Sequence, residues 1–295
     1  MRTLLPTRQP YSFDQTVAFI RRFPPCHGEY IVDDDALTAA VTVGSRAVPL
    51  TIRRTGKTLE VETPRAADMP AVAAHAAHWI GAEDDVGALY AAARGDAAFS
   101  ALIEQLHGLH HVRFLTLEEI SVYCVMMQRT PITMASRMKR AFLAAFGTPL
   151  EVAGHALRAM PSLAALAQLD GEAIGKAIKH AHKGPMIATV VRGIAAIGEA
   201  TLREAPYAEA RDALLAIPGI GPFSAGAILL RGLGRMDEVP SVKMFADAAA
   251  TIYGRAIDEA AIARRYGAQI GYWSFYVKTG AARHSAPPRG GQHRE

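Results

Sequence analysis

The residues Ile217-Pro218-Gly219-Ile220-Gly221-Pro222 could bind a phosphate group through their backbone. Two glycines separated by one apolar residue let the chain reverse sharply, because glycine tolerates positive φ and close approach to another group. Pro222 suits the first turn of a helix, where N–H groups lack helical partners and can bind an anion. Such a contact reads no base sequence and would bind any duplex. The alternative is an ordinary packing corner between two helices.

A second run that could do chemistry follows about twenty residues later and contains Asp237, Glu238, Ser241 and Lys243. A carboxylate can stabilise a developing positive charge, and a hydroxyl can orient a water molecule. A lysine withdrawn from water can act as a nucleophile. The alternatives are that the two acids are solvated loop residues and that Lys243 contacts phosphate or lies at the surface.

The composition of the chain limits which classes of protein it can belong to. The chain has 295 residues, half of them apolar, a net charge of +4 and a pI near 9.1. It can bury a sizeable core, and its charge permits a nucleic-acid partner. Two distant cysteines, Cys26 and Cys124, argue against a disulfide framework and a four-cysteine metal site. Neither a membrane span nor a secretion signal is recognisable, so we expect no membrane partner and a cytoplasmic location.

The pattern of apolar residues and turns along the chain predicts an α+β fold that is mostly helical, and its elements must position the residues above. Alternating apolar residues and glycine-bearing turns predict an antiparallel meander, preceded by a helix over 13–23. After Pro64 the sequence is alanine-rich with helical spacing, and no further strand is expected. The predicted strands are 37–43, 47–54 and 59–62; the predicted units are an N-terminal α+β domain over 1–65, a helical body over 66–282 with a helix-hairpin-helix at about 207–233, and a disordered tail over 283–295.

Local signals predict two helices of the body. Thr116-Leu117-Glu118-Glu119 resembles a capping box, which would begin a helix there. A later stripe of apolar residues from Met134 to Phe146 predicts a core-facing helix, with Lys139 among the basic residues elsewhere around it. The histidines of His110-His111 and His180-Ala181-His182 have no third ligand at metal spacing, so we expect them at the surface and expect no metal site.

Four stretches of the chain together resemble the helix-hairpin-helix DNA glycosylases, within them the 3-methyladenine glycosylase II branch that removes alkylated bases. The resemblance implies an N-terminal antiparallel sheet domain joined to a helical body, double-stranded DNA gripped by the hairpin, a flipped base held in a cleft, and a monomer. The stretches are Pro10–Phe23 with the meander, Val125–Thr130, the hairpin, and Gly271–Tyr276.

The resemblance also implies roles for particular residues. In the family a carboxylate near C1′ stabilises the positive charge that forms on the sugar, but here Ser241 or Val242 stands at that position. Asp237 or Glu238 would have to replace it, and Lys243 lies beside the same position. The lysine that bifunctional members carry after the hairpin is Phe223 here, which matches the monofunctional branch.

Three further residues match positions near the base in the family. Tyr272 and Trp273 fall where aromatic residues line the base pocket, with core packing as the alternative. Gln128 lies near the wedge that fills the gap left by the base, with an exposed loop residue as the alternative.

The resemblance therefore predicts a base excision repair protein that flips an alkylated purine and hydrolyses its N-glycosidic bond. No cofactor is expected, apart from a monovalent cation that hairpin carbonyls near Ile217 and Ile220 could coordinate. The missing carboxylate motivates one alternative, a catalytically impaired protein that binds DNA lesions. A protein-binding scaffold is a further alternative.

Overall fold

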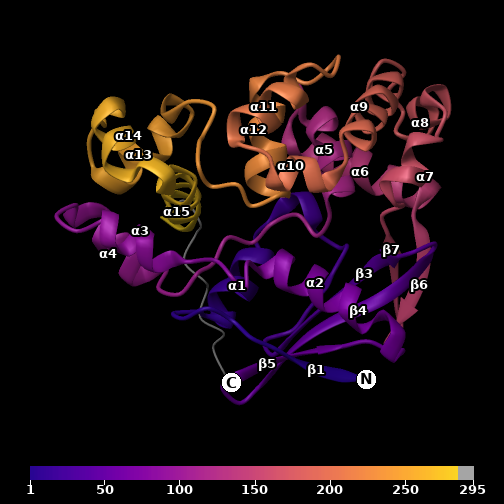
Figure 1. Ribbon diagram of the computed structural model, residues 1–295, viewed down its shortest axis with the longest axis horizontal. Coiled ribbons are helices and arrows are strands. Elements are labelled where there is room, and N and C mark those ends of the chain that lie inside the picture. The colour runs from indigo at the N-terminus through magenta and orange to yellow at the C-terminus, as the bar shows by residue number, and fades with distance from the viewer. Residues whose placement is uncertain (285–295) are drawn as a thin grey trace, which may run out of the picture.

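An antiparallel sheet of five strands, in the order β1-β5-β4-β3-β2, opens the fold (Figure 1). The computed structural model describes residues 1–284 of the chain. In β4 the side chains alternate between core and surface, as a half-buried strand requires. The predicted meander is confirmed, and two short edge strands extend it. The strands are β1 (Arg2–Leu5), β2 (Ile31–Val32), β3 (Ala36–Val43), β4 (Arg46–Thr55) and β5 (Thr58–Glu62).

Two helices pack beside this sheet. Helix α2 (Met69–Ile80) contacts β1, β3, β4 and β5 and ends at Gly81, whose φ of +61° suits a helix terminus. Helix α1 (Phe13–Ile20) begins at Ser12, whose hydroxyl accepts a hydrogen bond from the amide of Gln15. It ends three residues before the predicted boundary.

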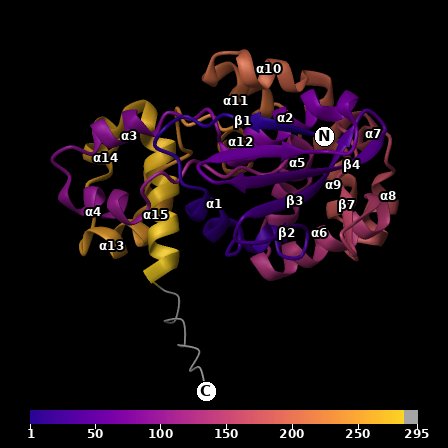
Figure 2. The same cartoon turned by 90° about the horizontal axis from the view of Figure 1, so that it is seen from below.

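Most of the remaining chain is helical, as predicted. Figures 1 and 2 place α3, α4, α13, α14 and α15 at one end of the molecule and α7 and α8 at the opposite end. The helices are α3 (Val86–Ala92), α4 (Ala97–Gln105), α5 (Leu117–Met127), α6 (Ile132–Phe146), α7 (Leu163–Ala167), α8 (Gly171–Ala177), α9 (Lys183–Ile197), α10 (Glu199–Glu204), α11 (Tyr207–Leu215), α12 (Pro222–Ala227), α13 (Ala246–Tyr253), α14 (Glu259–Tyr266) and α15 (Ile270–His284). Short turns are η1 (Pro24–Cys26), η2 (Ala66–Asp68), the π-helical η3 (Ile228–Gly232), η4 (Val242–Phe245) and η5 (Gly267–Gln269).

The expectation of no strand after Pro64 is wrong. A hairpin of β6 (Thr148–Val152) and β7 (His155–Ala159) follows α6. Its turn, Ala153-Gly154, has positive φ at both residues, the geometry of a tight two-residue hairpin. Strand β7 packs against β3 and β4, and this tertiary contact stabilises strands too short to be recognised from their pattern.

Two large apolar clusters form the core. One joins the sheet to α2, α3, α4 and the C-terminal helices, and the other joins α5, α6, α8, α9, α11 and α12. The first cluster continues from the sheet into later helices, so a domain boundary at residue 65 stays a prediction. Helix α15 runs through His284, two residues into the predicted tail, and the rest of that tail lies outside the described residues.

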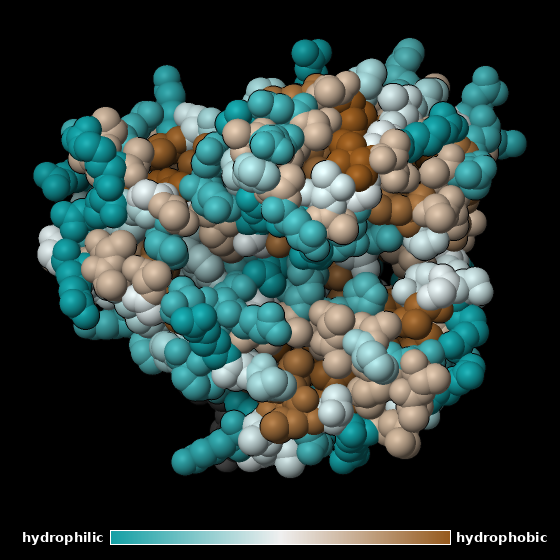
Figure 3. Space-filling view, in the orientation of Figure 1, coloured by the Kyte–Doolittle hydropathy of each residue, from teal (hydrophilic) through white to brown (hydrophobic). Residues whose placement is uncertain are grey.

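The surface is mixed in character. On the face in Figure 3, apolar residues form separate patches within a largely hydrophilic surface. Among the described residues, no helix combines the length and the apolar character that crossing a membrane requires.

Candidate functional site

The predicted hairpin is present between α11 and α12. Gly219 has a φ of +95°, and a Cβ there would lie 2.9 Å from the Met186 side chain. The amide of Ile220 donates to the carbonyl of Ile217 at 3.0 Å, and both isoleucine side chains are buried. The turn therefore needs glycine at 219 and is anchored by apolar side chains beneath it.

The outer edge of the hairpin is open. Pro218, Gly219, Gly221 and Pro222 are exposed, whereas the side chain of Ile220 points inward. Gly221 is the N-cap of α12, and a Cβ on it would meet no atom within 4 Å. The edge is accessible to a ligand as large as a nucleic-acid backbone.

Gln128 supports the hairpin from the end of α5. Its amide donates to the carbonyl of Gly219 at 2.8 Å and to the hydroxyl of Ser224 at 3.3 Å. The ammonium of Lys183 donates to three carbonyls at the same end of α5, at 2.7 to 2.9 Å. Gln128 thus contacts the hairpin backbone and ties it to α5.

A cavity of about 430 Å³ lies beside the hairpin. It is bounded by the end of α1 and the loop after it, by α5, by α12 with η3, by η4 and by α15, while Gln128 does not line it. This volume is in the range of small-ligand sites, and aromatic rings on its walls could stack on a planar heterocycle. Six phenylalanines line it: Phe19, Phe23, Phe114, Phe223, Phe245 and Phe275.

The four polar residues predicted near the sugar do not line this cavity. Asp237 and Glu238 are exposed and form ion pairs with Arg235 and Arg211, each at 3.3 Å. Ser241 and Lys243 are also exposed. The same segment instead contributes Pro240 and Met244 to the cavity wall.

Of the three aromatic residues predicted in the base pocket, one lines the cavity and two do not. Phe223, in the first turn of α12, lines the cavity and is 47% exposed. Tyr272 and Trp273 are buried outside it: the hydroxyl of Tyr272 donates to Asp84, and the indole N–H of Trp273 donates to the hydroxyl of Tyr253 at 3.1 Å. Helix α15 lines the cavity through later residues, Ser274, Phe275, Lys278, Thr279, Ala282 and Arg283.

Arg231 is the residue of this cavity that sequence reasoning missed. It lies on η3, and its guanidinium carbon is 4.9 Å from the ring centre of Phe23 and 5.4 Å from those of Phe19 and Phe275. One nitrogen donates to Nε2 of His111 at 3.0 Å. A signal was available, because Phe223, Ala227 and Arg231 recur at intervals of four residues along one helical face.

The charged groups on the cavity wall are all cations. Arg22, Arg231, Lys278 and Arg283 line it, and no aspartate or glutamate does within residues 1–284. Burial and the neighbouring Arg113 lower the pKa of Arg231 to about 10, and burial together with Arg231 lowers the pKa of Lys278. The cavity is therefore apolar on most of its wall and positive in its field.

The expectation that His110 and His111 lie at the surface is wrong. Both are fully buried, because the chain on either side of them carries core side chains such as Leu109 and Val112. The ring nitrogens of His110 lie 2.6 and 3.0 Å from the carbonyl oxygens of Gly81 and Pro10. Burial, Arg231 and Arg113 lower the pKa of His111 well below its usual value.

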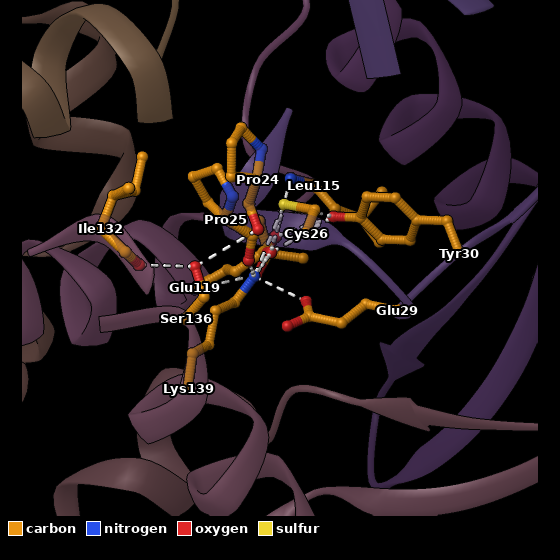
Figure 4. A network of polar contacts seen from close by, with 11 residues as sticks. Pro24, Pro25, Cys26, Glu29, Tyr30, Leu115, Glu119, Ile132, Ser136 and Lys139 are labelled. Atoms are coloured by element: carbon orange, nitrogen blue, oxygen red, sulfur yellow. Dashed lines mark hydrogen bonds and ion pairs between the residues drawn. The ribbon is translucent and has the colours of Figure 1, made fainter. Parts of the chain in front are cut away.

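The fully buried side chain of Lys139 lies at the centre of a network of polar contacts (Figure 4). The ammonium of Lys139 is fully buried and donates to carboxylate oxygens of Glu119 and, at 2.6 Å, Glu29. It also donates to the carbonyl of Pro25 at 3.1 Å and lies 3.5 Å from the sulfur of Cys26. Although burial opposes it, the neighbouring Cys26, Glu119 and Glu29 raise the pKa of Lys139.

This Lys139 cluster also explains how the capping residues of α5 are used. The hydroxyl of Thr116 accepts from the amide of Glu119 at 3.2 Å, as a capping box requires. The carboxylate of Glu119 turns instead to the amide of Leu115 and to Lys139. Cys26, Glu29 and Glu119 are close enough to share a metal ion, but Lys139 already supplies the positive charge between them.

A monovalent cation at the hairpin carbonyls, which the resemblance implies, stays a prediction. The carbonyl of Ile217 accepts one hydrogen bond, from Ile220, and retains a second lone pair. Backbone carbonyl oxygens are the ligands that replace the hydration shell of K⁺. Ile217 and Ile220 would hold such a cation, which would add positive charge beside a bound phosphate.

Comparison with known proteins supports the architecture. No protein-family model matches the chain. A 3-methyladenine DNA glycosylase from Archaeoglobus fulgidus superposes with a TM-score of 0.80 at 19% identity, covering 97% of this chain and 100% of that one. The chain therefore shares the fold of this DNA glycosylase.

Curated relatives match only part of the chain. A probable bifunctional transcriptional activator/DNA repair enzyme AlkA from Mycobacterium tuberculosis is 29% identical over 163 residues, which are 53% of this chain and 31% of that protein. A DNA-3-methyladenine glycosylase from Bacillus subtilis is 24% identical over 157 residues, 52% of each protein. The chain thus spans about half or less of the length of these relatives.

Proposed function

We propose that this protein is a DNA glycosylase that binds duplex DNA at the hairpin and excises a damaged base flipped into the cavity. One observation carries the proposal. Helix α12 begins at the exposed hairpin edge and then lines the aromatic cavity through Phe223 and Gly226, so one element joins the backbone contact to the base site. A glycosylase needs this combination, because it must extrude the nucleotide and hold the base between aromatic and apolar side chains.

The named relatives support an enzyme more than a protein that only binds lesions. One is named a DNA repair enzyme and the other a DNA-3-methyladenine glycosylase. The monofunctional mode, the monomeric state and the cytoplasmic location that the sequence predicts are parts of the same proposal.

In the proposed reaction, water adds to C1′ as the bond to the base breaks. Positive charge develops on the sugar. No carboxylate of residues 1–284 lines the cavity, so the negative phosphates of the bound strand would stabilise that positive charge. The residues that line the cavity contact the departing base rather than the sugar.

Base release from duplex oligonucleotides tests the enzymatic proposal. Substrates that each hold one 7-methylguanine, hypoxanthine, uracil or 8-oxoguanine are incubated with protein, and free bases are measured by chromatography. We expect release of at least one base, and a fall of about tenfold or more with Phe223→Ala, since stacking of one base is worth about 1–3 kcal/mol. Absence of release from every substrate would overturn the proposal.

A pair of variants at Gly221 tests the DNA contact separately. Aspartate and asparagine are both good N-caps, and there is open space for either side chain. Only Gly221→Asp places a negative charge where the proposal puts a phosphate. We expect Gly221→Asp to weaken duplex binding at least tenfold more than Gly221→Asn, with the melting temperature of both preserved. Equal affinities would favour a packing corner.

A further inference from the structure

The guanidinium of Arg231 is a positive charge held at the cavity, and it has no acidic partner within residues 1–284. Its hydrogen-bond partner is the imidazole of His111, and its flanks are the rings of Phe19, Phe23 and Phe275. Three other arginines, Arg235, Arg113 and Arg54, each contact an aspartate. Arg231 is half-buried and lines the cavity, so its charge is available to a ligand that enters there.

His111 orients the guanidinium without neutralising it. Arginine has only donors, so Nε2 of His111 must accept, and the imidazole there is uncharged. The backbone amide of His111 donates to the hydroxyl of Tyr272 at 3.1 Å, and that hydroxyl donates to Asp84, which Arg113 holds by an ion pair. His111 therefore holds one N–H of the guanidinium, and the remaining N–H groups can donate to a ligand in the cavity.

The other cations reinforce this requirement. Arg22, Lys278 and Arg283 share the cavity wall, and within residues 1–284 no acidic side chain joins them. A base that carries a positive charge would enter a field of its own sign. A neutral base with a carbonyl oxygen would instead accept a charge-assisted hydrogen bond from one of these cations.

We propose that the cavity selects a neutral base that presents a carbonyl oxygen to Arg231, as deamination produces, and disfavours a cationic N-alkylated base. This inference rests on the proposed glycosylase function. Deamination of adenine replaces an amino donor by a carbonyl acceptor, so hypoxanthine meets the guanidinium where adenine would not. Deaminated bases are also mispaired, which lowers the cost of extruding them compared with guanine or thymine in a regular pair.

The same field favours the chemical step for a neutral base. When water adds to C1′, the electron pair of the C1′–N bond leaves with the base, which departs as an anion. The water loses a proton to solvent, and the base anion gains one from solvent. Cations around the base stabilise this developing negative charge more than the neutral ground state. A cationic base leaves as a neutral molecule and would gain nothing from them.

Single-turnover base release with a charge-matched control tests this inference. The proteins are the native chain, Arg231→Met, Arg231→Lys and Arg65→Met; the last removes an exposed charge just after the sheet, outside the cavity lining. The substrates are duplexes with one hypoxanthine opposite thymine, one uracil opposite guanine, or one 7-methylguanine opposite cytosine.

We expect the native protein to release hypoxanthine or uracil at least tenfold faster than 7-methylguanine. Arg231→Met should slow release of the neutral bases by about 100-fold, the usual effect of removing a donor aimed at developing negative charge. Arg231→Met should slow the release of 7-methylguanine less, so that the ratio of neutral-base release to 7-methylguanine release becomes smaller. Arg231→Lys should recover part of the rate, because it keeps the charge and loses the fork. Arg65→Met should behave as the native protein.

The outcomes separate this inference from the function on which it rests. Faster release of 7-methylguanine than of the neutral bases, with a ratio unchanged by Arg231→Met, would overturn the selectivity and leave a DNA glycosylase in place. Release of no base would overturn both. Circular dichroism of each variant shows whether a lost rate reflects lost folding.

Discussion

Lys139, which is fully buried, and Arg231, which is half-buried, each lie against one ring of a neighbouring aromatic pair, and their charges have opposite kinds of partner. Lys139 lies 5.5 Å from the ring centre of Phe114, Arg231 lies 4.9 Å from that of Phe23, and the two rings are 5.3 Å apart. Lys139 contacts two carboxylates, whereas Arg231 contacts a neutral imidazole. A cation that is paired with carboxylates of its own protein stabilises the fold. A cation at a cavity wall without such a partner is available to a ligand.

The difference follows from where the acids lie. Glu119 is on α5 and Glu29 is on the loop after η1, so Lys139 of α6 ties three segments together in the interior. In the part of the chain that the structure describes, no carboxylate pairs with Arg231, whose neighbours on α1 and α15 present rings. The Lys139 cluster and the Arg231 cavity can therefore be disturbed separately.

Lys139→Met should have the largest effect on stability. It leaves the carboxylates of Glu29 and Glu119 buried without their cation, a loss that typically costs about 3–5 kcal/mol. We expect the melting temperature, followed by circular dichroism, to fall by about 10 °C. Glu119→Gln in the same protein should recover part of the loss. An unchanged melting temperature would mean that the cluster does not hold the fold together.

Glu29→Gln should change the dependence of stability on pH. Burial raises the pKa of Glu29 from 4.5 to about 7, so in that interval the folded state binds more protons than the unfolded chain. The stability that this group contributes is complete below pH 4.5 and is lost as the pH rises through 7. We expect the native protein to lose about 1–3 kcal/mol relative to the variant between pH 5 and pH 8. Parallel pH profiles, measured by urea unfolding, would contradict this.

Arg231→Met should alter stability much less than the same substitution at Lys139. No carboxylate is stranded, and methionine suits the rings of Phe19, Phe23 and Phe275. We expect a melting temperature within about 3 °C of the native value, in either direction. A fall as large as that of Lys139→Met would show that Arg231 also serves mainly to hold the structure.

The smallest effect should come from replacing Asp237 and Glu238 together by asparagine and glutamine. Both acids are exposed, and their ion pairs with Arg235 and Arg211 lie at the surface. We expect the melting temperature to change by less than about 1 °C and base release by less than about twofold. A loss of release of 100-fold or more would instead identify one of them as the carboxylate that reaches the sugar.

The sequence was most informative where structure is decided locally. The turn at Gly219 needs positive φ, and Pro222 suits the start of a helix, so the hairpin could be predicted from six residues. Tyr272 and Trp273 show the limit: the resemblance placed them at the base pocket, but the rotation of α15 about its axis directs Ser274, Phe275 and Lys278 to the cavity instead. That rotation depends on contacts with helices distant in sequence.

Buried charges were the other feature beyond reach. Lys139 stands among basic residues on a helix that looked amphipathic, and Arg231 follows an apolar run. Whether such a residue faces water or the interior depends on Glu29 or His111, which lie about 110 and 120 residues away. Chain proximity carries no information about pairs of this kind.

The number of residues in the π-helical turn η3 determines whether the Arg231 side chain faces the cavity. A turn of this type holds an extra residue compared with an α-helix, and Arg231 is its fourth residue. Removing one residue there would rotate the next part of the chain by about 100° relative to Phe223 and the start of α12. Insertions and deletions in Ile228–Gly232 could therefore move the charge into or out of the cavity while every amino acid around it stays the same.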